Sequence, residues 1–178
     1  MIPLESVQIG IERSLENTQR LLDDAKLLFE NKRYASAVSI GALSLEELGK
    51  AILLLNELVQ KRDVSTTLWK KIFRSADAHI EKFKAPHKYH ELLGFKSVDY
   101  SERQKINTII NALCKDFNLR KQRGFYVDWI EGKWWSPTML PPSILESWSE
   151  DLIDMTEFYL NILKKCAKKI CGERGRYP

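Results

Sequence analysis

The stretch YASAVSIGALSLEELGK, residues 34–50, decides the fold, because small residues, two adjacent carboxylates and a lysine interrupt an otherwise apolar helix. Its small side chains allow a neighbouring backbone to approach closely. Each of its two glycines costs roughly 1 kcal/mol relative to alanine in a helix interior, so packing or function must compensate. We therefore expect other parts of the chain to pack around this helix on several sides.

The two adjacent carboxylates, Glu46 and Glu47, have different surroundings in the helical pattern. With a rotation of about 100° per residue, Glu47 falls within an apolar stripe, whereas Glu46 and Lys50 have the favourable i,i+4 order for a local ion pair. An unpaired buried carboxylate is too costly to tolerate. We therefore expect a raised pKa for Glu47 or a cation from another helix beside it. Such a pair is either structural or part of a functional site.

Helical periodicity extends beyond this stretch in both directions, because apolar residues recur at steps of three, four or seven. The predicted helices cover about residues 4–31, 34–60, 65–83, 101–117 and 143–171. Pro86 is expected to prevent the third helix from continuing past it. Short connections between long amphipathic helices predict an all-α fold, an up-and-down antiparallel helical bundle of about five helices.

A short aromatic segment, residues 126–135, separates the last two predicted helices. Two runs of strand-forming residues flank a two-residue turn that contains Gly132, which predicts a small β-hairpin. The rings either close one end of the bundle by burial, which is the interpretation we favour, or remain available for base stacking. These rings belong to Phe125, Tyr126, Trp129, Trp134 and Trp135.

Size and composition are those of an ordinary globular protein. The chain has 178 residues, of which 44% are hydrophobic and 29% charged. We expect one helical domain over residues 1–171 and a frayed C-terminal tail over residues 172–178. No apolar run approaches the roughly 20 residues that span a bilayer, and the first residues lack the pattern of a secretory signal. We therefore expect a cytoplasmic protein without membrane association.

Charge and metal-ligand patterns narrow the possible ligands. The net charge is +4, and lysine and arginine outnumber acidic residues between positions 61 and 96. Such a segment is typical either of nucleic-acid contact or of a solvated helix face. The three histidines lie between residues 79 and 90 with no cysteine among them, and this is not the spacing of a metal site. We expect no metal and no other cofactor.

Arg74 and His79 are the pair with the most specific candidate chemistry. They lie on the predicted third helix, about 140° apart around its axis, where they can flank one groove. An arginine and a histidine at this spacing also occur by chance. The alternative is that His79 is a hydrogen-bonded core or interface residue, because it shares a stripe with Ile72 and Phe83.

Three blocks of the sequence, taken in order, resemble the AbiV-type abortive infection proteins, which belong to the broad HEPN superfamily of helical bundles. The first is the small-residue helix that ends SLEELGK at residues 44–50. The second is the segment 69–82, and the third is RGFYVD at residues 123–128, followed by Pro137. The resemblance covers about residues 10–165. It implies phage defence and a single HEPN-like helical domain.

Through the superfamily, the resemblance also implies a homodimer in which an Arg-x(4 to 6)-His motif forms a metal-independent ribonuclease site. Arg74 and His79 match that spacing. In the superfamily a polar Asn, Asp or His usually follows the arginine directly, whereas Ser75 follows it here. Imidazole at this site would take the proton from a ribose 2′-hydroxyl. The guanidinium would stabilise charge on the adjacent phosphate, and a second copy would supply the proton for the leaving oxygen.

Several other residues are candidates for supporting roles. An arginine from the segment before the hairpin, Arg123, is expected to reach Glu47 or Glu46, or else to pair with Asp128. Lys50 and Lys82 either hold RNA phosphates or face solvent as ordinary helix residues. The complete supporting set is Glu46, Glu47, Arg123, Tyr126 and Asp128 for orientation, with Lys50 and Lys82 for RNA binding.

The rival hypothesis is a non-enzymatic helical interaction protein that arrests infected cells by binding a partner protein. The basic segment and the spacing of Arg74 and His79 favour RNA as the partner. Ser75 and the apolar stripe around His79 favour binding alone. A phage-encoded or host protein is a possible trigger under either hypothesis.

Overall fold

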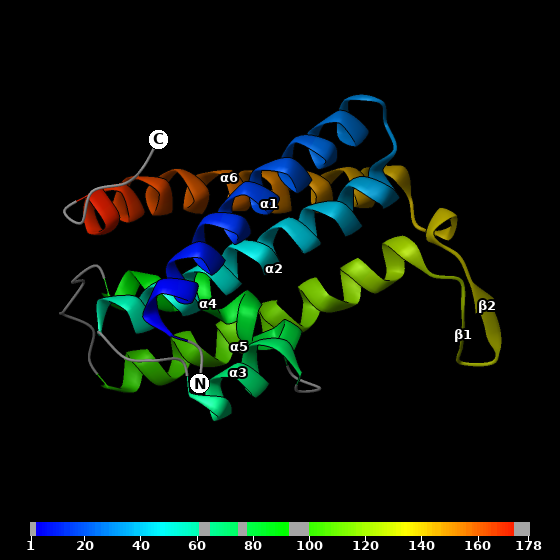
Figure 1. Ribbon diagram of the computed structural model, residues 1–178. Helices are drawn as coiled ribbons and strands as arrows, with labels where there is room; N and C mark the ends of the chain where they lie inside the picture. Colours follow the sequence, from blue (N-terminus) through cyan, green and yellow to red (C-terminus); the bar gives the residue numbers. More distant parts are fainter. Residues whose placement is uncertain (1–2, 61–64, 75–77, 93–99, 173–178) are drawn as a thin grey trace.

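The computed structural model describes residues 3–60, 65–74, 78–92 and 100–172 (Figure 1). Between helices α5 and α6, strands β1 (Asp128–Ile130) and β2 (Lys133–Trp135) form a hairpin, followed by the short 3-10 helix η1 (Pro137–Met139). The predicted all-α bundle with a hairpin between its last two helices is confirmed. The α-helices are α1 (Leu4–Glu30), α2 (Tyr34–Val59), α3 (Thr66–Phe73), α4 (Ala78–Leu92), α5 (Tyr100–Phe125) and α6 (Pro142–Gly172).

Helix α2 lies at the centre of the bundle. It contacts α1, α4, α5 and α6, and α1 runs alongside it in the opposite direction (Figure 1). Its buried residues occur all around the helix rather than on one stripe. The prediction that the stretch at residues 34–50 is packed on several sides is therefore confirmed.

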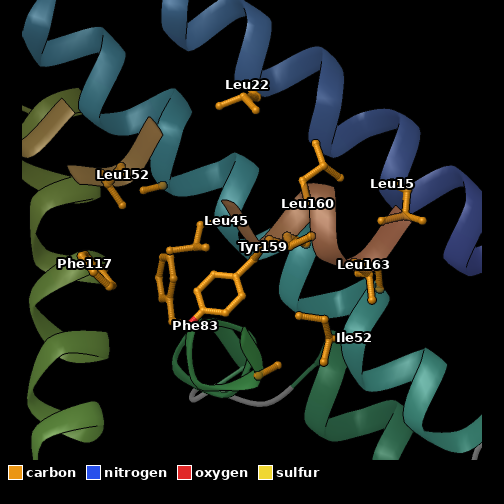
Figure 2. Packing of buried hydrophobic residues seen from close by; sticks show 14 of the residues in the cluster. Leu15, Leu22, Leu45, Ile52, Phe83, Phe117, Leu152, Tyr159, Leu160 and Leu163 are labelled. Atoms are coloured by element: carbon orange, nitrogen blue, oxygen red, sulfur yellow. The ribbon is translucent and has the colours of Figure 1, made fainter. Parts of the chain in front are cut away.

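The core gathers apolar side chains from all the long helices around α2 (Figure 2). Phe83 of α4 is fully buried, and its ring lies 5.8 Å from that of Phe117 on α5, centroid to centroid. Leu45 and Ile52 of α2 face the same interior, as does Leu160 of α6. Full burial of one such side chain contributes roughly 1.5–3 kcal/mol, so this cluster fixes how α4 and α5 sit on α2.

The predicted third helix, over residues 65–83, is wrong as a single element. Helix α3 ends at Phe73 and α4 begins at Ala78, while residues 75–77 lie outside the described part of the chain. The expectation that Pro86 limits this helix is also wrong, because α4 continues through Pro86 to Leu92. Proline removes the N–H that would bond the carbonyl four residues earlier, which is that of Lys82. Tertiary packing against α2 compensates for this loss.

Gly49 is where that packing is tightest. A Cβ at this position would overlap the carbonyl oxygen of Lys82 and would lie 2.6 Å from the carbonyl carbon. The carbonyl that Pro86 deprives of its helical donor therefore lies directly against the backbone of α2. Glycine is required here because any side chain would push the two helices apart.

Helix α5 is longer than predicted and packs on α2 in a similar way. It continues from the predicted end near Phe117 to Phe125. A Cβ on Gly124 would lie 2.5 Å from the carbonyl oxygen of Ala35. One turn earlier, the Ser39 hydroxyl donates a hydrogen bond to the carbonyl of Lys121 at 3.0 Å. These contacts fix the last turns of α5 against the N-terminal half of α2.

The predicted hairpin is confirmed, with Asp128 opposite Trp135 and Trp129 opposite Trp134. Both residues of its turn have positive φ, 51° at Glu131 and 79° at Gly132, as a type I′ turn requires. The hairpin stands away from the helices (Figure 1). The favoured interpretation that the rings of this segment are buried is wrong for Phe125 and Tyr126, which are 42% and 62% exposed, and for Trp129 and Trp134, which are 57% and 66% exposed.

Candidate functional site

A buried carboxylate, Glu46, joins three helices in a polar cluster. Its residue is only 4% exposed. Lys121 of α5 donates a hydrogen bond to Oε1 at 2.5 Å, and His79 Nδ1 of α4 lies 2.7 Å from Oε2. Lys82, one turn after His79, places its Nζ 3.6 Å from Oε2. We refer to Glu46, His79, Lys82 and Lys121 as the Glu46 cluster.

The charges of this cluster set the pKa of Glu46. Burial alone would raise the pKa, but the hydrogen bond and charge of Lys121, followed by those of His79, outweigh burial and bring the pKa below its ordinary value. Glu46 is therefore ionised at neutral pH. Burial lowers the pKa of Lys82, although attraction to Glu46 opposes that change.

The prediction that Glu47 is the buried carboxylate is wrong, and so is the predicted pair of Glu46 with Lys50. Glu47 instead accepts a hydrogen bond from Lys50 at 2.6 Å, and its side chain is 20% exposed. The apolar stripe on α2 did not reveal which of two neighbouring carboxylates would meet polar side chains from α4 and α5. Cations from other helices are present as expected, but they are Lys121 and Lys82, and both pair with Glu46.

His79 combines a fixed imidazole with access to solvent. Its side chain is 50% exposed. In the tautomer that carries a proton on Nδ1, this N–H donates to Glu46, and Nε2 keeps a lone pair that can accept a proton. Of the alternative that His79 is a hydrogen-bonded core or interface residue, the hydrogen bond is present and the core placement is wrong, because half of the side chain reaches the surface. The carboxylate-bound imidazole is a geometry suited to general base chemistry.

Arg74 directly follows α3 and is exposed. Among the described residues, no hydrogen bond or ion pair joins its guanidinium to the Glu46 cluster. The predicted placement of Arg74 and His79 on one helix is wrong, because Arg74 comes directly after the end of α3 at Phe73, whereas His79 lies on α4. The preceding residue, Phe73, has its ring centre 5.6 Å from Nζ of Lys50. The end of α3 therefore lies beside the polar residues of α2, and Ser75 is outside the described residues.

Both lysines predicted to bind phosphate lie near the two glutamates. Lys82 is buried in the Glu46 cluster, and Lys50 pairs with Glu47. The alternative that they are ordinary solvent-facing residues is wrong. Lys121 was missed by sequence reasoning because the helix was predicted to end near Phe117. Continued to Phe125, that helix places Lys121 on the same stripe as Phe117 and Cys114, which is a pattern of burial.

Arg123, Tyr126 and Asp128 are not part of the Glu46 cluster. The guanidinium of Arg123 lies over the ring of Trp135, 5.2 Å from its centre, so the expectation that Arg123 reaches Glu47 or Glu46 is wrong. The reason is helical geometry, because Arg123 is about 200° around α5 from Lys121. Asp128 accepts a hydrogen bond from the backbone N–H of Trp129 at 2.8 Å and forms no ion pair with Arg123.

Membrane spans and metal sites are both absent from the described residues. None of their helices is both long and apolar enough to cross a membrane. In the same part of the chain, no three His, Cys, Asp or Glu side chains are grouped so that they could hold a metal ion. His87 and His90 have side chains outside the described set.

Comparison with known protein families matches residues 6–141 to HEPN_AbiV, described as AbiV. The chain belongs to the AbiV family of HEPN proteins. The match begins in α1, includes the Glu46 cluster and the hairpin, and ends where α6 begins. AbiV membership indicates abortive infection, a form of phage defence. No curated protein and no solved structure gives a significant match.

Proposed function

We propose that this AbiV protein acts in phage defence as an endoribonuclease that needs no metal ion. The observation that carries the proposal is the 2.7 Å contact between His79 Nδ1 and Glu46, combined with a half-exposed imidazole. A carboxylate fixes the orientation and tautomer of the imidazole in the way that a general base requires. The proposed reaction class is transfer of the RNA phosphate from its 5′-oxygen to the neighbouring ribose 2′-oxygen.

The proposed reaction begins when Nε2 of His79 takes the proton from a ribose 2′-hydroxyl. The 2′-oxygen then forms a bond to the adjacent phosphorus, and the bond from phosphorus to the 5′-oxygen of the next nucleotide breaks. The products are a 2′,3′-cyclic phosphate and, once the leaving oxygen is protonated, a free 5′-hydroxyl. Arg74 follows Phe73, whose ring lies beside Lys50. In this scheme the guanidinium of Arg74 stabilises the negative charge that grows on the phosphate.

A homodimer completes this scheme. The Glu46 cluster of one copy contains one imidazole, which acts as the base, so the leaving oxygen needs an acid from elsewhere. We propose that His79 of a second copy donates that proton across a twofold interface. Attraction of RNA is supported by the charges at the site, because in the described part of the chain three lysines, Lys50, Lys82 and Lys121, form their ion pairs with two carboxylates, Glu46 and Glu47.

Cleavage of RNA in EDTA tests the proposal. Wild-type protein should release fragments ending in 2′,3′-cyclic phosphate, and His79→Ala should abolish this cleavage. Glu46→Gln should reduce it by roughly 10-fold or more, because the imidazole loses its charged partner. Lys165→Ala, an exposed change on α6, is the matched control and should cleave like wild type. Equal cleavage by wild type and His79→Ala, or no cleavage at all, would exclude the proposed enzyme.

A second candidate function is supported by a different observation. Trp129 and Trp134 form an exposed edge-to-face pair, with ring centres 5.3 Å apart, on a hairpin that stands away from the bundle. Exposed aromatic surface of this kind is typical of contact with another macromolecule. On this reading the protein arrests infected cells by binding a phage-encoded or host protein, without cutting RNA. The EDTA assay separates this alternative from the enzyme.

A further inference from the structure

A second candidate site lies on the opposite side of α5 from the Glu46 cluster. A cavity of about 470 Å³ separates the last turn of α5 from the hairpin, and we call it the hairpin cavity. Strand side chains alternate between the two faces of a sheet. This alternation brings Asp128, Ile130 and Trp135 to the cavity and leaves Trp129 and Trp134 on the other face.

Two donors at the hairpin cavity have no acceptor. Nε of Arg123 and Nε1 of Trp135 are buried and make no hydrogen bond within the described part of the chain. Both residues line the cavity, and the guanidinium lies over the indole ring. Buried donors are nearly always hydrogen-bonded, and leaving one unsatisfied costs about 1–3 kcal/mol. Because these two nitrogens have almost no accessible surface, a ligand in the cavity would have to place its acceptors against the outer part of the Arg123 guanidinium.

The same cavity also presents an acceptor. Asp128 lines it, and the hydrogen bond from the N–H of Trp129 to Oδ1 holds its carboxylate in place. A phosphate or an acidic side chain offers acceptors alone, so it would satisfy Arg123 but would be repelled by Asp128. The cavity therefore suits a planar ligand that has hydrogen-bond acceptors along one edge, toward Arg123, and donors along the adjacent edge, toward Asp128.

Guanine has that arrangement. Its O6 and N7 atoms are acceptors, which arginine contacts in a bidentate manner, and its N1–H and N2 amino group are donors for a carboxylate. Adenine has an amino donor where guanine has O6, so it would place a donor against Arg123. Tyr126 and Trp135 add aromatic surface to the wall of the cavity, and unpaired bases commonly stack on such rings.

We propose that the hairpin cavity binds one unpaired guanine base of single-stranded RNA, with Arg123 facing O6 and N7 and Asp128 facing N1 and N2. The choice of RNA rests on the proposed ribonuclease function. The two sites use different faces of α5, so the cavity would select the sequence near the cut without taking part in the reaction.

Fluorescence anisotropy with labelled RNA tests this proposal. His79→Ala protein is used so that binding is measured without cleavage. The probes are two ten-nucleotide oligouridines, one with a single central guanine and the other with a single central adenine. We expect the guanine probe to bind about tenfold more tightly, which is within the discrimination typical of a bidentate contact.

Two matched variants assign that preference to the cavity. Asp128→Ala removes an exposed carboxylate that lines the cavity, and Glu131→Gln removes one negative charge from the turn of the same hairpin. Asp128→Ala should lower the guanine preference below about threefold, whereas Glu131→Gln should leave it unchanged. Arg123→Gln should weaken guanine binding in the same way, and circular dichroism checks that each variant is folded.

The outcomes separate this proposal from the ribonuclease. A guanine preference in a protein that never cleaves RNA would support the cavity and exclude the enzyme. Cleavage by wild type without any difference between the two probes would support the enzyme and overturn the cavity. A preference that survives Asp128→Ala, or a hairpin that binds a protein but neither probe, would also overturn it.

Discussion

Replacement of Gly49 by alanine tests how α4 is held against α2. In an ordinary helix interior this change stabilises the protein by roughly 1 kcal/mol. At Gly49 the new Cβ would overlap the Lys82 carbonyl oxygen and lie 2.6 Å from its carbon, where ordinary contacts begin at 3.4 Å. Both partners are backbone atoms of packed helices, so neither can rotate out of the way.

The magnitude follows from that overlap. The two helices must separate by roughly 1 Å, which removes a quarter to a half of the dispersion attraction across the contact. Overpacking costs about 1–3 kcal/mol and sometimes more, and a backbone clash belongs at the upper end. After subtraction of the helix-propensity gain, we expect Gly49→Ala to lower the free energy of unfolding by about 2 kcal/mol.

Urea unfolding followed by circular dichroism measures this change. Gly10→Ala is the matched control, because its Cβ would meet only Cδ1 at the end of the Leu54 side chain, at 3.2 Å. That side chain can move, so the control should be neutral or slightly stabilised. A Gly49→Ala protein as stable as wild type, or more stable, would refute the close approach of α4 to α2.

Three other predictions concern the Glu46 cluster and the hairpin. Because the pKa of Glu46 is lowered in the folded protein, its contribution to stability is complete above the ordinary glutamate pKa of 4.5 and is lost as pH falls through the folded value. Glu46→Gln should therefore flatten the loss of unfolding free energy below pH 4.5, as measured by urea titrations at a series of pH values. Lys121→Met should destabilise the protein by about 3 kcal/mol at neutral pH, because it leaves Glu46 buried with a weaker set of cations; thermal unfolding that matches wild type would contradict this. Trp134→Ser should change the unfolding free energy by less than about 0.5 kcal/mol, since the ring is exposed, and a larger loss by calorimetry would mean that the ring is packed.

The helices were predictable from sequence where local periodicity decides the structure. Leu45, Leu48 and Ile52 repeat at helical spacing on α2 and are buried, and Gly132 marks the hairpin turn. The break between α3 and α4 and the passage of α4 through Pro86 depend on tertiary packing. Local rules assign a high cost to proline in a helix interior; they carry no information about the α2 backbone that receives the carbonyl of Lys82.

The candidate site was predictable only in part, for the same reason. His79 was identified as a candidate, and a buried glutamate on α2 with a cation from another helix was expected. The identity of that glutamate depends on where α4 and α5 cross α2, which Gly49 and Gly124 determine. The donors of Arg123 and Trp135 at the hairpin cavity depend on the fold of the hairpin against α5. The spacing of residues in the sequence reveals neither where α4 and α5 cross α2 nor how the hairpin folds against α5.

The composition of the Glu46 cluster differs from what stability alone would favour. Buried ion pairs can often be replaced by apolar residues with little loss of stability or even a gain. This bundle instead buries Glu46 with Lys82 and Lys121, and it brings their helices together through glycines that are poor helix formers. In this arrangement the Glu46 carboxylate is held inside the bundle, and the His79 imidazole bonded to it reaches the surface of the bundle. A fold selected for packing alone would have no reason to keep His79 half exposed on a buried charge.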